Sequence, residues 1–422
     1  MLETIRNLFK IPDLKKRLYF TLGMLVVVRL GSHLPLPGVN KEALTNLFAQ
    51  GGILGFFDLF AGGALSRFSV FALGIMPYIN ASIIMQLLTA VIPTLEQWAK
   101  EGEDGRDKIT KITRYFTVFL AIVQAFGISV WLQNMGVLTI SGFSFRFLLL
   151  ITLTAGTCFL MWLGEQITDF GIGNGISIII FAGIVAQIPS ELAQTIKLLQ
   201  VGEISIISLL SLIIIGIIVV GGVIAIQQGQ RRIPVQYAKR VIGRKMYGGQ
   251  STHIPLRVNQ AGVIPIIFAS AFLLFPATIA QFFQNITFMK SMAAALSPGQ
   301  PLYLVLYSIL IILSTFFYSA ITFNPINLAD NMKKYGGFIP GIRPGKNTSV
   351  FIDHIMTRIT LSGAIFLTII AILPNFLIKI TGITTFYFGG TSILIMVGVA
   401  LETIQQIESH LLMRHYEGFI KK

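Results

Sequence analysis

Ten stretches of about 20 mainly apolar residues run along the chain, each bounded by charged residues or by proline and glycine. An α-helix rises about 1.5 Å per residue and the hydrocarbon core of a bilayer is about 30 Å thick, so each stretch can cross a membrane once. The pattern therefore predicts an all-α polytopic membrane protein. The predicted spans lie near residues 18–35, 68–92, 113–134, 145–164, 172–190, 204–226, 260–282, 302–323, 356–379 and 384–405.

The ten predicted spans fall into two sets of five. An odd number of spans in each set makes the two halves antiparallel, which permits an inverted repeat around a central site. Before the first span, MLETIRNLFKIPDLKKR places apolar residues at helical spacing among polar ones and suits a short helix on the membrane surface. The predicted organisation is an amphipathic N-terminal segment at 1–17, a first half at 18–195, a second half at 196–405 and a tail at 406–422.

One apolar segment is too short to be a simple span. Between Gln50 and Arg67 the chain reads QGGILGFFDLFAGGALSR, with pairs of glycines near both ends. As a helix it would be only about 25 Å long, and Asp58 would be costly in lipid. We expect a re-entrant or half-length helix over about 52–66 that packs within the protein. The alternative is an amphipathic loop on the outer side of the membrane.

The composition agrees with a chain that lies mostly in lipid. Hydrophobic residues make up 54% of the chain and charged residues only 12%, whereas soluble proteins carry about 25%. Net charge is +14, and cytoplasmic loops of membrane proteins concentrate lysine and arginine. A cytoplasmic N-terminus leaves only seven of the 32 basic residues outside, which predicts that both termini are cytoplasmic. Those seven are Arg29, Lys41, Arg67, Arg146, Lys197, Lys290 and Lys379.

Two cytoplasmic loops, over about 227–259 and 324–355, carry more basic residues than topology requires. Loops of this length in compact proteins are usually functional or disordered. One interpretation is contact with anionic lipids. The other is docking of a cytosolic partner that carries acidic groups or RNA phosphates, which arginine can bind through two parallel hydrogen bonds. The candidate docking residues are Arg231, Arg232, Lys239, Arg240, Arg244, Lys245, Lys333, Lys334, Arg343 and Lys346.

The sequence offers little support for an enzyme or an ion-coupled transporter. No ionisable residue lies near the middle of a predicted span, where proton and ion pathways normally place one. The segment GIRPGKNT imitates a phosphate-binding loop, but Pro340 and Asn347 occupy its required glycine and Ser/Thr positions. Lone Cys158 and five scattered histidines show no metal-ligand spacing. A small-solute secondary transporter stays open as an alternative, while an intramembrane enzyme has no residue pattern in its favour.

Seven segments, distributed in order over nearly the whole chain, resemble signature segments of the SecY family of protein-secretion channels. Several are ten or more residues long, which makes chance agreement not credible. The segments are FALGIMPYINASIIMQLL (71–88), IGNGIS (172–177), RRIPVQYAKR (231–240), YGGQSTHIPL (247–256), AGVIPIIFAS (261–270), GIRPGKNT (341–348) and YFGGTS (387–392).

The resemblance implies an hourglass channel between two five-helix halves, closed by a short plug helix and narrowed by a ring of aliphatic side chains. Its predicted ring residues are Ile79, Ile83, Ile176, Ile180, Ile267 and Ile395, and its predicted plug residues are Phe56, Phe57, Asp58, Leu59, Phe60, Gly62 and Gly63. Two of the pairs, Ile79 with Ile83 and Ile176 with Ile180, have the i, i+4 spacing that puts both side chains on one helix face. Ordinary core packing is the alternative interpretation of these pairs.

The resemblance also implies a lateral gate between the second and seventh spans, through which signal sequences and membrane segments reach lipid. The candidate gate residues are Ser82, Gln86, Thr89 and Ser270. Implied partners are the small membrane subunits SecE and SecG, and the SecA motor ATPase or the ribosome at the two basic loops. Substrates would be unfolded secretory polypeptides, and the implied location is the bacterial cytoplasmic membrane. No cofactor is implied.

Overall fold

A computed structural model of the 422-residue chain gives the arrangement of its helices and strands. The structure describes residues 11–40, 43–44, 55, 58, 60–140, 142–202, 204–237, 240–242, 245–247, 251–282, 287–297, 299–381 and 390–420. The predicted surface segment at 1–17 lies mostly outside this part of the chain.

Long helices account for most of the fold, and each of the ten predicted spans overlaps at least one of them. The first half contains α2 (Pro12–His33), α5 (Met76–Val91), α6 (Pro93–Lys100), α7 (Glu103–Asn134), α8 (Phe143–Phe170), α9 (Gly175–Val185) and α10 (Ile188–Val201). The second contains α11 (Ile206–Gln228), α12 (Ile264–Phe282), α13 (Thr287–Ala295), α14 (Pro301–Thr322), α15 (Pro325–Lys334), α16 (Lys346–Thr381) and α17 (Gly390–Ile420). In the described residues, six helical runs are long and apolar enough to cross a membrane, or seven if α5 and α6 form one span.

The predicted span over 68–92 is wrong at its start. Residues 61–75 form successive turns, and α5 begins only at Met76. Gly62, Gly63 and Gly74 all have positive φ angles there, which a continuing helix cannot accommodate. The short helix predicted over 52–66 therefore stops before its predicted end. At its far end α5 meets α6 at a bend of 100°, where Pro93 opens the new helix.

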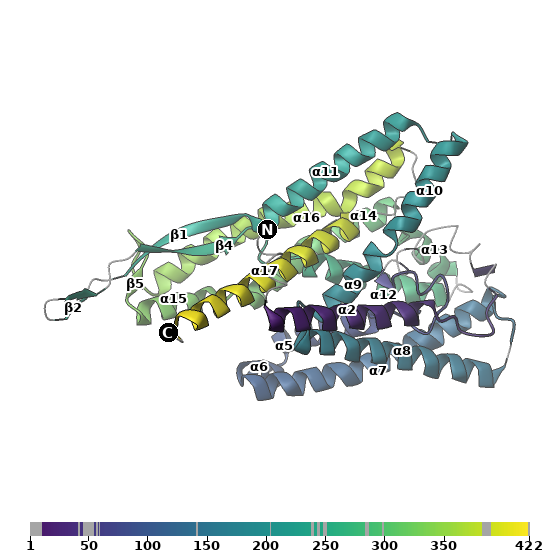
Figure 1. Ribbon diagram of the computed structural model, residues 1–422, viewed down its shortest axis with the longest axis horizontal. Helices are drawn as coiled ribbons and strands as arrows, with labels where there is room; N and C mark the ends of the chain where they lie inside the picture. Colours follow the sequence, from purple (N-terminus) through teal and green to yellow (C-terminus); the bar gives the residue numbers. More distant parts are fainter. Residues whose placement is uncertain are drawn as a thin grey trace.

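Figure 1 shows the two halves as two groups of helices, with α2, α5, α7 and α8 in one and α11, α14, α16 and α17 in the other. Helices α9 and α12 lie between them. Direct contacts across the halves join α12 to α5 and α7, and α9 to α17. One large hydrophobic core includes residues of both halves, from Val28 in α2 to Val399 in α17.

A small antiparallel sheet lies beside α15 and α16 at one end of the molecule (Figure 1). Strand β1 (Gln230–Tyr237) lies in its middle, between β4 (Ser251–Arg257) and β5 (Gly337–Phe338). A separate two-stranded ribbon pairs β2 (Arg240–Ile242) with β3 (Lys245–Tyr247). In β1, Ile233 and Val235 are buried while their neighbours are exposed, as expected for a strand with one covered face.

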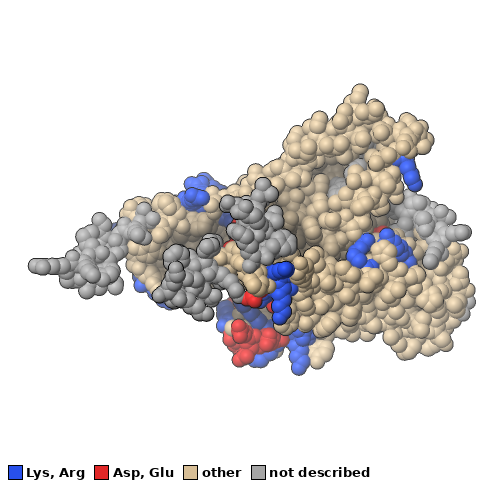
Figure 2. All heavy atoms as spheres, viewed as in Figure 1, with Lys and Arg blue, Asp and Glu red and all other residues tan. Residues whose placement is uncertain are grey.

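Lysine, arginine, aspartate and glutamate are unevenly distributed over the surface. Figure 2 shows one broad face with few such side chains along its middle and a cluster of both signs near α6. Helix α11 is exposed along most of its apolar length, and only Val219 and Val223 among its residues are buried. Such a helix is stable when lipid or another apolar surface covers it.

Candidate functional site

The six predicted ring isoleucines come from four helices and meet in one hydrophobic cluster. Ile79 and Ile83 lie on α5, Ile176 and Ile180 on α9, Ile267 on α12 and Ile395 on α17. Five of them are buried, and half-buried Ile176 packs against the same cluster. The structure thus brings together residues more than 300 positions apart, while their role as a ring stays a prediction.

Helix α9 has a well-defined start that fixes where its two isoleucines point. Asn174 caps it by accepting hydrogen bonds at Oδ1 from the backbone N–H groups of Ile176, at 3.1 Å, and Ser177, at 3.2 Å. Gly173 precedes the cap with φ +81°. A capping asparagine satisfies N–H groups that have no partner within the helix. The IGNGIS segment is therefore the local signal that begins α9.

The described plug residues form a compact turn held by Asp58. Its Oδ1 accepts hydrogen bonds from the backbone N–H groups of Leu65, at 3.0 Å, and Ser66, at 2.9 Å. Gly62 and Gly63 follow with φ of +65° and +80°. Phe60, which is 4% exposed, belongs to the same hydrophobic cluster as the ring isoleucines. Three predicted plug residues, Phe56, Phe57 and Leu59, lie outside the described residues.

Two side chains of the first half reach the backbone of this turn. Arg29 of α2 donates from Nη1 to the carbonyl oxygen of Gly62 at 3.0 Å. Gln187, between α9 and α10, donates from Nε2 to the carbonyl oxygen of Asp58 at 3.1 Å. Neither contact was predicted from the sequence. For Arg29, a signal was present, because a cation near the outer end of an apolar span needs a partner.

Three of the predicted gate residues lie on α5 and form hydrogen bonds within that helix, while the fourth, Ser270, lies on α12 and contacts α14. Helix α12 contacts α5, the pair of helices between which the gate was predicted, and it also contacts α7. Gln86 on α5 donates to Ser82 Oγ at 3.4 Å, and the Thr89 hydroxyl donates to the Met85 carbonyl, so these bonds stay within α5. All three side chains are half-buried.

Ser270 on α12 contacts α14 through its hydroxyl group. Its hydroxyl donates to the Ile266 carbonyl at 2.8 Å and lies 3.1 Å from the hydroxyl of Tyr307. Ser270 is 1% exposed and Tyr307 is 2% exposed. The structure therefore pairs Ser270 with a tyrosine of its own half. A buried tyrosine usually needs a hydrogen-bond partner, so Tyr307 could have been recognised as a candidate from its apolar surroundings in sequence.

The two basic loops, predicted separately, form one body. Strand β5 of the second loop pairs with β1 of the first, with Gln236 opposite Phe338 and Tyr237 opposite Gly337. Residues of both loops share a small core that includes Ile233, Met332 and Ile339. This joining was not foreseen, because β5 is only two residues long.

Exposed basic side chains lie on both contributing loops. Arg231 and Arg232 are exposed on β1, Lys333 and Lys334 end α15, and Arg343 and Lys346 lie just beyond β5. The backbones of Arg240 and Lys245 lie in the β2–β3 ribbon, while Lys239 and Arg244 are outside the described residues. The result is a cationic surface at the end of the molecule where the sheet lies.

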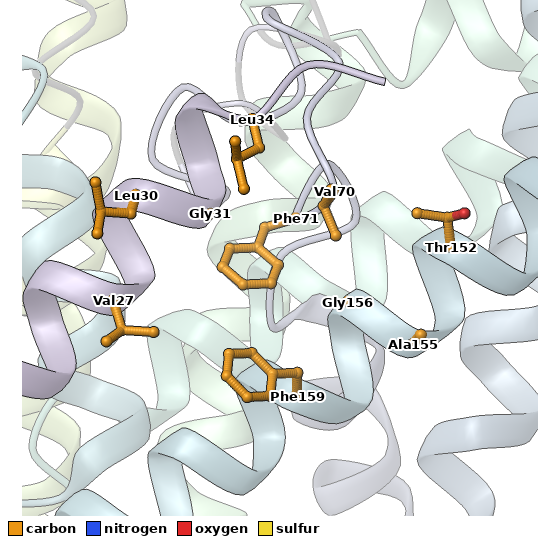
Figure 3. A pocket seen from close by; sticks show the side chains of 10 residues that line it. All are labelled: Val27, Leu30, Gly31, Leu34, Val70, Phe71, Thr152, Ala155, Gly156 and Phe159. Carbon is orange, nitrogen blue, oxygen red and sulfur yellow. The ribbon is translucent and has the colours of Figure 1, made fainter. Parts of the chain in front are cut away.

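A separate apolar pocket of about 420 Å³ opens between α2 and α8 (Figure 3). Phe71 lies at its floor, pressed against Gly31 of α2, while Gly156 of α8 lies against the carbonyl of Val70. A Cβ on either glycine would collide with these atoms. Small residues here let the Val70–Phe71 segment insert between the two helices. Phe71 also belongs to the isoleucine cluster, but the pocket lining includes none of the predicted site residues.

Comparisons with known sequences agree with this geometry. A model of the SecY family matches residues 69–404. The protein translocase subunit SecY of Pseudomonas aeruginosa is 48% identical over 98% of this chain and 94% of its own. The same subunit of Escherichia coli is 51% identical over 97% of this chain and 94% of its own.

Solved structures share the fold at lower identity. A protein-conducting channel superposes with a TM-score of 0.68 at 20% identity and 96% coverage of both chains. A second structure, described as one in which the plug domain of SecY stabilises the closed state and maintains a membrane seal, gives 0.67 at 20% identity and the same coverage. The Sec61 channel of a canine ribosome complex gives 0.65 at 19% identity, again covering 96% of both chains.

Proposed function

The chain belongs to the SecY family, the channel subunits of protein translocases, and we propose that its polypeptide path runs between the two halves through the isoleucine cluster. It is a multi-pass membrane protein and a protein-conducting channel, and it is not an enzyme. The observation that carries the proposed path is the meeting of six isoleucines from both halves in one apolar cluster. In this role Ile79, Ile83, Ile176, Ile180, Ile267 and Ile395 form the narrowest part of the channel.

Aliphatic side chains suit a pore that must pass many different sequences. A hydrophobic constriction disfavours water and ions by dewetting. Isoleucine also offers no hydrogen bond or charge that would hold a passing chain. The packed cluster corresponds to a closed channel, in which the side chains of the two halves fill the space between them.

The segment over about 52–66 is proposed as the plug. Its turn packs Phe60 and Ala64 into the isoleucine cluster, and this contact supports a plug that rests against the proposed constriction. A related structure is described as having a plug domain that stabilises the closed state, and this description supports the same role here. Displacing this segment would leave the isoleucines as the remaining barrier.

The seam between α12 and the pair α5 and α7 is proposed as the lateral gate. Only these helices and the pair α9 and α17 bring the halves into substantial contact within the described part of the chain. Parting at the α12 seam gives signal sequences and transmembrane segments a route into lipid. We assign Ser82, Gln86 and Thr89 of α5 to this seam as its polar side chains, and such groups stabilise helix contacts by only about 0.6 to 2 kcal/mol.

The cationic surface of the two basic loops is proposed as the docking site for the driving partner, a SecA motor or a translating ribosome. One structural relative is named as part of a ribosome complex. SecE and SecG are the proposed small membrane partners, and anionic lipids meet basic residues at the same face. We place the protein in the bacterial cytoplasmic membrane with both termini in the cytoplasm, because the basic loops belong on that side.

Cysteine crosslinking tests the path. In a Cys158→Ala background, Ile79→Cys should crosslink to a secretory polypeptide stalled during translocation. Ile213→Cys on the exposed surface of α11, where the side chain is 48% exposed, is the matched control and should not. Equal crosslinking at both positions, or none at Ile79→Cys in an active complex, contradicts the proposed path.

A further inference from the structure

Two side chains of the first half donate hydrogen bonds to the backbone of the plug. The bonds from Arg29 to the Gly62 carbonyl and from Gln187 to the Asp58 carbonyl join the plug turn to α2 and to the junction of α9 and α10. The two carbonyls lie four residues apart. Because both anchors bind carbonyl groups, they act whatever side chains the plug carries at those positions.

The plug turn also approaches α9 more closely than any side chain permits. A Cβ added to Gly62 would lie 2.8 Å from the Cα of Gly183. Gly62 has φ +65°, a conformation that glycine adopts without strain. The turn therefore rests directly on the backbone of α9, which brings the two carbonyls within reach of their donors.

Two neighbouring side chains bond to the backbone of Arg29. Its carbonyl oxygen accepts hydrogen bonds from the Ser32 hydroxyl at 2.8 Å and from His33 Nδ1 at 2.8 Å. With Nδ1 donating, His33 Nε2 accepts from Nη1 of Arg67 at 2.9 Å. Arg67 follows the plug turn in sequence, so the same turn of α2 contacts the plug at its middle and just beyond its end.

We propose that Arg29 and Gln187 are positioning residues of a latch that keeps the plug seated on the first half. The proposal rests on the assignment of the 52–66 segment as the plug. A single hydrogen bond shifts an equilibrium by about two- to tenfold, and a charged donor such as Arg29 by more. Two such bonds favour the seated plug while leaving it able to open when a polypeptide arrives.

Thiol labelling measures seating directly. Ala64 is fully buried in the isoleucine cluster, so Ala64→Cys in a Cys158→Ala background should react slowly with a membrane-impermeant maleimide added from outside. Arg29→Met and Gln187→Met should each raise the labelling rate of the resting channel by about three- to tenfold. Arg29→Lys, which keeps a donor, should restore part of the protection. Arg146→Met, another arginine near the outer end of a span, is the matched control and should change nothing.

Ion leak through the same resting channels, reconstituted in liposomes, separates the latch from the plug assignment. Raised labelling with raised leak supports both. Raised labelling with unchanged leak supports the latch and overturns the plug as the seal. Unchanged labelling in both Arg29→Met and Gln187→Met overturns the latch. Gln187→Met removes one neutral donor at a helix junction, so it tests the idea even if Arg29→Met lowers the yield of folded protein.

Discussion

Hydrogen-bond partners at the proposed gate seam differ from those that residue type alone suggests. Ser270 keeps both of its contacts inside the second half, through the Ile266 carbonyl and the Tyr307 hydroxyl. The sequence predicted that Ser270 lies on the seventh span, which is α12, but the rotation of α12 decided that its hydroxyl meets Tyr307. The polar contribution to the seam therefore falls to α5, where Gln86 makes only a long bond of 3.4 Å to Ser82.

Replacing Gln86 with leucine should loosen selection at the gate. A polar side chain at a helix seam contributes about 0.6 kcal/mol on average, so the variant should accept weak signal sequences about threefold more readily. Export of a reporter with a defective signal sequence measures this. Gln133→Leu, at the exposed outer end of α7, is the control. If Gln86→Leu exports the reporter with the defective signal sequence no better than the unmodified protein does, the proposed role of Gln86 is wrong.

At the scale of elements, hydropathy located the helices well because a bilayer demands about 20 apolar residues per span. It failed where apolar chain is not helical, as in residues 61–75 before α5. Glycine and buried packing decide that segment. Gly31 and Gly156 leave the space in which Val70 and Phe71 insert between α2 and α8.

Gly156→Ala should destabilise this arrangement. The added Cβ would meet the backbone carbonyl of Val70, which cannot move aside as a flexible side chain could. Overpacking of this kind typically costs about 1 to 3 kcal/mol. The melting temperature of the purified protein in detergent should fall. Gly216→Ala on α11, where a Cβ meets nothing within 4 Å, should leave it unchanged. Equal melting of the two variants would refute the packing argument.

For the whole molecule, the main result of folding is that two distant basic loops become one surface. The β1–β5 pairing and the shared core around Ile233 and Met332 join them. Exposed Arg343 lies beside this junction on the second loop. Its side chain is free to meet a partner, since within the described chain only its backbone carbonyl is bonded, to Thr348.

Arg343→Glu should abolish motor-driven export while the protein still folds and inserts. Reversing one charge on a cationic docking surface replaces attraction to acidic groups by repulsion. Export into membrane vesicles driven by the motor and ATP measures the effect, which should exceed tenfold if Arg343 is central to the surface. Lys197→Glu, the same reversal at the other end of the molecule, should be tolerated. Normal export with Arg343→Glu would contradict the proposal that the motor docks at this surface.

The sequence by itself determined the membrane character, the approximate positions of ten spans and the concentration of basic residues in two loops. Each of these depends on residues close together in the chain, which periodicity and composition report directly. Only the tertiary structure decided that isoleucines from α5, α9, α12 and α17 meet, that β5 joins the two basic loops, and that Arg29 and Gln187 reach the plug backbone. Those contacts depend on how helices rotate and cross, and that geometry is set by packing between segments far apart in sequence.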